Sequence, residues 1–262
     1  MGLQLLKIVV SSDQHLGYEN ADKTSFSKFL DGLRDDSELT DLVLLGDVVD
    51  MWRRDSSGVF LENWDIVTRI KNLADRVRVH YVAGNHDFHV LRLQAHGYPF
   101  QFVKNLRLAD GDCNYLFVHG YEFDPMQEEP IMEALCRVMS DEGGSFETGT
   151  WAALTEEWSD LRFLFSALFK KNSIRNQVES VRIRPEDRLR DTLDSVEKSA
   201  LASKQPGEVL VFGHTHHPFI NPERDLVNSG SWVKDAPIHN TYVEISNGTV
   251  RLLTFDGNEI NP

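Results

Sequence analysis

Five short polar motifs, each closely following an apolar run, constrain the fold of this 262-residue chain more than any other feature. The runs are rich in Val, Ile and Leu and are bounded by Gly, Asn and Asp, a pattern typical of buried strands. Ligand sites in α/β sheets form at the carboxyl ends of strands, so we expect the polar side chains to meet there. The runs and their motifs are Leu5–Val10 with Asp13-Gln14-His15, Leu42–Leu45 with Gly46-Asp47-Val48-Val49-Asp50, Val77–Val82 with Gly84-Asn85-His86-Asp87, Tyr115–Val118 with His119-Gly120, and Val209–Phe212 with Gly213-His214-Thr215-His216.

The motifs contain seven potential metal ligands. These are carboxylates, imidazoles and one carboxamide, without a thiolate, and such donors suit Mn, Fe, Zn or Ni. Seven donors exceed the need of one tetrahedral ion but suit two ions that share a bridging carboxylate. Two cations about 3.5–4 Å apart can clamp both oxygens of an in-line phosphoryl displacement. The seven candidate ligands are Asp13, His15, Asp47, Asn85, His119, His214 and His216.

Each of these residues, taken alone, has a simpler explanation. An isolated Asp is commonly a turn or helix-cap residue, and an isolated His is commonly a core or surface side chain. Five of the ten histidines fall inside the five motifs, however, which favours a shared site. We expect ordinary roles for the remaining histidines, which are His80 (within a strand), His89, His96, His217 and His239.

The ordered motifs D-x-H, G-D-x-x-D, G-N-H-D, H-G and G-H-x-H resemble the calcineurin-like metallophosphoesterase superfamily over residues 13–216. The resemblance implies an α/β fold, a four-layer α/β/β/α sandwich of two mixed sheets with a helical insertion. It implies a single domain over residues 1–262. It also implies two divalent metal ions, with Mn favoured over Fe, Zn or Ni.

The same resemblance implies a role for each motif residue. Asp13, His15 and His216 would bind the first metal, Asp47 would bridge, and Asn85, His119 and His214 would bind the second. His86 resembles the family's proton donor to the leaving oxygen, and Asp50 resembles its orienting carboxylate. The implied reaction is hydrolysis of a phosphodiester, pyrophosphate or phosphomonoester bond in a small organophosphate, by a hydroxide that bridges the metals.

Several local elements are also predicted. Residues 25–33, 60–74 and 88–95 have the pattern of helices. Asn247-Gly248 is a strong hairpin signal, and the segment from Asn228 to Trp232 indicates a simple tight turn.

The segment from Pro125 to Gln205 has no clear strand pattern and indicates helices, interrupted at Gly143-Gly144 and at Pro185. Metal motifs flank it on both sides, so we predict a helical, lid-like insertion over residues 125–205. Its place in the chain and Asp13-Gln14-His15-Leu16 resemble the UDP-2,3-diacylglucosamine hydrolase-like branch. That branch tends to have Arg where this chain has His86.

Two features of the insertion bear on partners. One helical face is apolar, and it could pack internally, line a substrate pocket, form a homo-oligomer interface or touch a membrane surface. A following basic run could bind phosphate or be a solvated face. The apolar face comprises Trp151, Leu154, Trp158, Leu161, Phe165 and Leu168, and the basic run comprises Lys170, Lys171, Arg175, Arg182, Arg184, Arg188 and Arg190.

Composition limits the partners and the compartment. The net charge of −14 disfavours binding to nucleic acid, since an acidic chain repels polyanions. The sequence contains no run with the length of a transmembrane helix and no signal-peptide pattern at its start. Two cysteines make no disulfide framework, so we expect a cytoplasmic protein.

Two other functions remain open from the sequence. A nuclease or phosphoprotein phosphatase of the same superfamily is one, but Met51-Trp52 stands where protein phosphatases usually have Arg-Gly. An inactive scaffold that binds a protein partner is the other. Scaffolds of that kind usually lose ligands, whereas the seven candidates are all present here.

Overall fold

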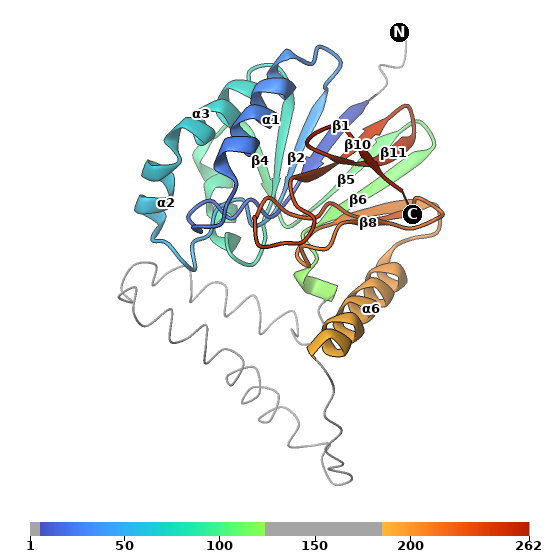
Figure 1. Ribbon diagram of the computed structural model, residues 1–262. Coiled ribbons are helices and arrows are strands. Elements are labelled where there is room, and N and C mark those ends of the chain that lie inside the picture. The colour runs from blue at the N-terminus through green and yellow to red at the C-terminus, as the bar shows by residue number, and fades with distance from the viewer. Residues whose placement is uncertain (1–5, 124–184, 262) are drawn as a thin grey trace.

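The computed structural model describes residues 6–123 and 185–261, which form two sheets packed face to face (Figure 1). Seven strands form the first sheet, in the order β12-β11-β10-β1-β2-β3-β4, and five form the second, in the order β5-β6-β7-β9-β8. Both sheets are mixed. The strands are β1 Lys7–Ser11, β2 Asp41–Leu45, β3 Arg78–Val82, β4 Phe100–Val103, β5 Asn105–Asp110, β6 Cys113–Val118, β7 Glu208–Phe212, β8 Phe219–Ile220, β9 Leu226–Asn228, β10 Thr241–Ser246, β11 Thr249–Thr254 and β12 Glu259–Ile260.

Helices cover the outer faces of both sheets. Alternate residues of a strand point to opposite faces, so Val9 of β1 packs toward the helices while Ile8 and Val10 pack toward the second sheet. The last described helix lies beside the second sheet (Figure 1), and its residues Val196 and Ala200 pack on that sheet. The predicted four-layer α/β/β/α sandwich is therefore confirmed. The helices are α1 Lys23–Asp35, α2 Ser56–Glu62, α3 Trp64–Leu73, the 3₁₀ segments η1 Phe88–His96 and η2 Tyr121–Phe123, and α6 Pro185–Ser203.

Most predicted elements are present, with some differences in detail. The single helix expected over residues 60–74 is divided into α2 and α3 at Asn63, whose side chain donates to the Val59 carbonyl at 2.6 Å. The helix expected after Asp87 is the 3₁₀ segment η1. Strands β4 and β5 were not predicted, because β4 is a short edge strand and β5 alternates buried and exposed residues only in part.

Three local predictions are confirmed. His80 lies within β3, and Asn247-Gly248 forms the turn between β10 and β11, where both residues have positive φ angles. Pro185 begins a helix, and this helix, α6, is the part of the predicted insertion that the structure describes. The apolar face and most of the basic run lie in residues 124–184, outside the described residues, so the insertion's boundaries and its lid role remain predictions. Among the described helices, none is long and apolar enough to cross a membrane.

Candidate metal centre

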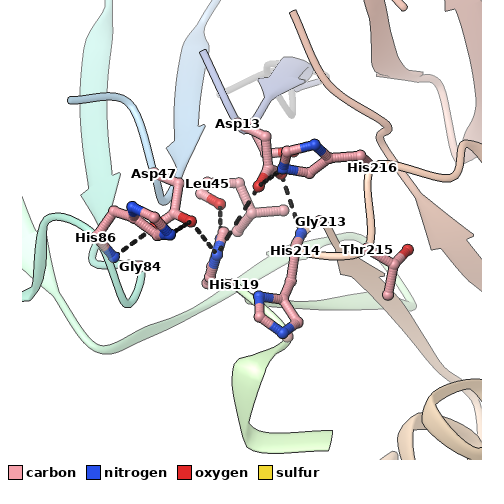
Figure 2. A network of polar contacts seen from close by, with 12 residues as sticks. Asp13, Leu45, Asp47, Gly84, His86, His119, Gly213, His214, Thr215 and His216 are labelled. Atoms are coloured by element: carbon pink, nitrogen blue, oxygen red, sulfur yellow. Dashed lines mark hydrogen bonds and ion pairs between the residues drawn. The ribbon is translucent and has the colours of Figure 1, made fainter. Parts of the chain in front are cut away.

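The five motifs leave their strands at one edge of the sandwich, where the carboxyl ends of β1, β2, β3, β6 and β7 converge. Figure 2 shows Asp13, Asp47, His119 and His216 pointing toward one another from these loops. Six of the predicted ligands form two clusters, and within each cluster the potential ligand atoms lie within 4.8 Å of one another. The first cluster is Asp13, His15 and His216, and the second is Asp47, His119 and His214. Asn85, the seventh candidate, lines the same small pocket of about 150 Å³.

Asp47 lies between the two clusters. Its Oδ2 atom is 3.2 Å from Nε2 of His119 in its own cluster and 3.7 Å from Nε2 of His15 in the first. Asp13 makes the reciprocal approach, with Oδ1 at 3.2 Å from Nε2 of His216 and at 3.9 Å from Nε2 of His119. Two cations bound here would be close enough to share the Asp47 carboxylate.

Two of the imidazoles, those of His15 and His119, are held through the ring nitrogen that faces away from the clusters. Nδ1 of His119 lies 2.8 Å from the Leu45 carbonyl, and Nδ1 of His15 lies 3.0 Å from Oδ2 of Asp50. In both rings Nε2 is then the atom that faces the cluster. Metal-binding histidines commonly have this arrangement, in which a carbonyl or carboxylate fixes the tautomer and the ring orientation.

Three buried atoms of the site make no hydrogen bond, although two of them face an oppositely charged group of another candidate ligand at 3.2 Å. They are Oδ1 of Asp13, Oδ1 of Asn85 and Nε2 of His119. Leaving a buried polar atom unpaired costs roughly 1–3 kcal/mol, so native proteins satisfy nearly all of them. A divalent cation would pair with all three, because they are oxygen and imidazole donors that it accepts. The donor set therefore fits the metal ions that the motifs imply.

The backbone at the site is unusual. Five of the candidate ligands adopt the left-handed region, with φ between 47° and 67°, a conformation uncommon for residues other than glycine. Such strain persists where the surroundings impose it, and it is concentrated at functional sites. The five are Asp13, His15, Asp47, His214 and His216. The absence of a side chain at Gly84 lets its backbone lie close to Asp47, since a Cβ atom there would overlap Oδ1 of Asp47.

Opposite charges dominate the electrostatics. Burial disfavours the charged forms, but the imidazole of His119 and its neighbours hold the pKa of the Asp13 carboxyl well below its usual value. Burial likewise opposes protonation of the histidines, yet the nearby carboxylates raise the pKa values of His15 and His119 to about 10. Protons thus balance the carboxylates in the absence of metal, and bound cations would take over that role.

The two predicted catalytic residues lie in contact beside the clusters. Nδ1 of His86 is 3.0 Å from Oδ1 of Asp50, while Nε2 is 4.0 Å from Oδ2 of Asp47. Asp50 therefore contacts both His15 and His86, one with each carboxylate oxygen. Burial raises the pKa of the Asp50 carboxyl, but the facing histidines more than offset this and hold it well below its usual value.

Sequence reasoning missed two residues that follow Asp50. The ring of Trp52 stacks on His86, with centroids 4.2 Å apart and planes 25° from parallel. Arg53 forms an ion pair with Asp50 and lines the same pocket. Their position, directly after the second motif, was the available signal.

The segment Asn228–Trp232, interpreted from sequence as a simple tight turn, supports the metal loops. Its residues are buried, and the Trp232 amide donates to the Asp13 carbonyl at 3.0 Å. The Asn228 side chain donates to the Gly213 carbonyl at 2.7 Å. The segment thus connects the first and last metal motifs, a supporting role that the interpretation as a simple turn did not include.

Comparisons with known proteins identify relatives of this chain. A family model described as Calcineurin-like phosphoesterase matches residues 6–218. A UDP-2,3-diacylglucosamine hydrolase from Shewanella sp. (strain MR-7) is 23% identical over 223 residues, which cover 82% of this chain and 84% of that protein.

Two solved structures are similar at greater distance. One is a predicted phosphoesterase from Streptococcus pneumoniae TIGR4, 17% identical, covering 98% of this chain and 93% of that chain with a TM-score of 0.38. The other is a dimetal phosphatase from Danio rerio, 13% identical, covering 95% and 99% with a TM-score of 0.43. TM-scores this low add nothing to the argument. The family match, which spans most of the chain and all five motifs, shows that this protein belongs to the Calcineurin-like phosphoesterase family.

Proposed function

We propose that this protein is a phosphoesterase that uses two divalent metal ions to hydrolyse a phosphodiester, pyrophosphate or phosphomonoester bond of a small organophosphate. One observation carries the proposal: two clusters of ligand atoms lie next to each other with the Asp47 carboxylate between them, and they include buried atoms that make no hydrogen bond. Native proteins rarely leave several buried polar atoms of one site without hydrogen bonds.

We assign Asp13, His15 and His216 to one cation, His119, His214 and Asn85 to the other, and Asp47 to both. Cations at these positions would supply a nucleophile at neutral pH and neutralise charge on the phosphoryl oxygens. We propose Mn²⁺ on the strength of the family resemblance, with Fe, Zn or Ni as alternatives that the mixed oxygen and imidazole donors also accept.

His86 is proposed as the proton donor to the leaving oxygen. Asp50 accepts from Nδ1, so the ring is oriented and Nε2 is left on the side of Asp47 and the pocket. Stacking on Trp52 further limits rotation of the imidazole. An acid placed in this way typically contributes a factor of roughly 10²–10⁴ to the rate.

The substrate is proposed to be a small molecule. The pocket between the motifs is only about 150 Å³, and the chain's net charge of −14 opposes long polyanions. A second candidate is a nucleotide-sugar pyrophosphate, favoured by the similarity to a relative named for UDP-2,3-diacylglucosamine. His86, in the place where that branch tends to have Arg, favours the more general diesterase instead.

The test begins with the metals. Chelator-treated protein should lose hydrolysis of bis(p-nitrophenyl) phosphate and regain it when Mn²⁺ is added, and elemental analysis should find two ions per chain. A screen across phosphomonoesters, phosphodiesters and nucleotide sugars would then rank the substrate classes. Two bound ions without turnover of any of these compounds would favour the scaffold alternative, and turnover in the presence of chelator would contradict the metal-dependent mechanism.

A further inference from the structure

The pocket wall contains residues that the metal and acid roles do not use. Besides the candidate ligands and His86, the pocket is lined by Tyr18, Arg53, Val233 and Asp235. Among the described residues that line it, Arg53 is the one with a permanent positive charge. Phosphate esters are anions, and the chain as a whole is strongly acidic. A side chain with a fixed positive charge in the wall of such a pocket could therefore contribute to substrate binding.

Arg53 is held in place from two sides. Its guanidinium pairs with Oδ2 of Asp50, and its own backbone amide donates to Oδ1 of the same carboxylate at 3.0 Å. The guanidinium also lies over the ring of Tyr18, 4.5 Å from the centroid. Tyr18 is fixed in turn through its hydroxyl, which donates to Asp235 at 2.9 Å. The plane of the guanidinium is thus set before any ligand arrives.

The guanidinium nevertheless retains the capacity to bind an anion. It has five N–H donors, and Asp50 engages one of its nitrogens. The Arg53 side chain is 38% exposed, whereas that of Asp50 has no exposed area. Solvent, and therefore a ligand, can reach the free donors.

The position of Arg53 indicates which anion it would meet. Asp50 contacts Nδ1 of His15, whereas Nε2 of the same ring faces the first ligand cluster. Arg53 pairs with Asp50. One imidazole and one carboxylate therefore separate the guanidinium from the first metal position. In this chain of contacts the guanidinium is not one of the groups that face the first metal position, and it remains available to a second charged group of the same substrate.

We propose that Arg53 is a specificity-determining residue that binds a second phosphate of the substrate, beyond the phosphorus that is attacked. The inference rests on the proposed phosphoesterase function and adds a substrate class to it, namely organophosphates with two phosphates. A planar guanidinium matches phosphate through paired hydrogen bonds, and binding energy from such a remote group can assist turnover as well as affinity.

Two substrates with the same leaving group test the proposal. These are p-nitrophenyl thymidine 5′-phosphate with and without a 3′-phosphate, which differ only in the second phosphate. The metal-loaded wild-type protein should favour the 3′-phosphorylated compound in kcat/KM by about tenfold or more, the worth of a charge-assisted hydrogen bond. Arg53→Gln should bring the ratio close to one, mainly through KM, and Arg53→Lys should retain part of the preference.

Arg54 provides a matched control. It is the next residue, its side chain is 39% exposed, and it pairs with Glu62 and Asp55, not with pocket residues. Arg54→Gln removes the same charge and should keep the wild-type ratio. Calorimetric titration with thymidine 3′,5′-diphosphate and thymidine 5′-phosphate should show the same preference in binding, and Arg53→Gln should abolish it.

The ratio separates this role from a structural one. If Arg53 only neutralised Asp50, Arg53→Gln would slow both substrates equally, and an unchanged ratio would overturn the proposal. A wild-type ratio near one in both kinetics and binding would overturn it as well. If the wild-type protein hydrolyses neither compound, the diesterase form of the proposed function fails, and the calorimetric preference still decides whether Arg53 binds a second phosphate.

Discussion

Strands β2 and β3 have buried polar side chains near both ends, and the two ends differ in whether these side chains have hydrogen-bond partners. At the amino end, Oδ1 of Asp41 is 2.8 Å from Nε2 of His80, and both of its oxygens accept from Arg78. The second ring nitrogen of His80 is 2.9 Å from Oε1 of Gln101. Each of these polar groups has a protein partner.

At the carboxyl end, the same strands lead to Asp47 and to Asn85-His86, where Oδ1 of Asn85 has no partner. Asp47 also has the left-handed backbone conformation, whereas Asp41 lies in regular strand. This difference shows that burial of Asp and His does not by itself distinguish a functional site from a structural cluster. Unpaired ligand atoms and backbone strain make that distinction.

The volume of the surface hollows alone would have indicated a site at the amino ends of the strands. The larger hollow, about 1100 Å³, lies at the amino end and is lined by Lys7, Arg76 and Arg78 among others. Those three cations are engaged with Asp36, with backbone carbonyls and with Asp41 respectively. The chemistry favours the small pocket at the carboxyl end.

Removal of the shared carboxylate should reduce metal content and hydrolysis more than any other substitution considered below. Asp47→Ala should lower metal content at both positions and reduce hydrolysis by more than about 10⁴-fold, because loss of the cations removes two contributions of several kcal/mol each. Elemental analysis and turnover of bis(p-nitrophenyl) phosphate check this. Asp41→Ala, at the other end of β2, is the control and should keep both ions in the folded protein. A single tightly held ion, unchanged in Asp47→Ala, would refute the dinuclear assignment.

The second effect concerns the proton donor. His86→Ala should keep its metal content and lose roughly 10²–10⁴-fold in kcat, the usual contribution of a general acid. The loss should be smaller for p-nitrophenyl esters than for alkyl esters, since p-nitrophenolate leaves without protonation. Equal losses for good and poor leaving groups would argue against the acid role.

A smaller effect should follow from crowding the bridge. In Gly84→Ala the added Cβ would overlap Oδ1 of Asp47, so the carboxylate must shift and metal affinity should fall by about 10–100-fold. Gly32 of α1 has open space around it, and Gly32→Ala should leave metal binding unchanged while stabilising the helix by roughly 0.5–1 kcal/mol. Metal titrations of the two variants measure the contrast; similar affinities would show that the loop adapts.

The smallest effect belongs to the amino end. Burial raises the pKa of the Asp41 carboxyl, but hydrogen bonds from His80, Arg78 and Thr40 more than offset this, so the pKa lies below its usual value. The carboxylate therefore stabilises the fold above the unfolded-state pKa, near 3.9, and this contribution is lost as pH falls through the folded pKa. Asp41→Asn should cost about 1–3 kcal/mol of unfolding free energy at pH 7 and less near pH 3.

Urea unfolding of chelator-treated protein at both pH values measures this, because metal loss then contributes at neither. An equal cost at both values would mean that the Asp41 charge does not contribute to stability.

The five strands that lead to the motifs, the order of the motifs and the identity of the candidate ligands could be predicted from the sequence. These properties are local: an apolar run with flanking Gly and Asp defines where a strand ends, and ligand type follows from residue type. The ordinary role of His80 was predictable for the same reason, since it falls inside an apolar run.

Only the tertiary structure showed how distant residues meet. Asp50 contacts His15 from the first motif and His86 from the third, Arg53 lies over Tyr18, and Trp232 donates to the Asp13 carbonyl. These contacts join loops that lie far apart in the sequence, as Asp13 and Trp232 do. No local pattern encodes them, because they depend on how the strands are ordered and on how the two sheets pack.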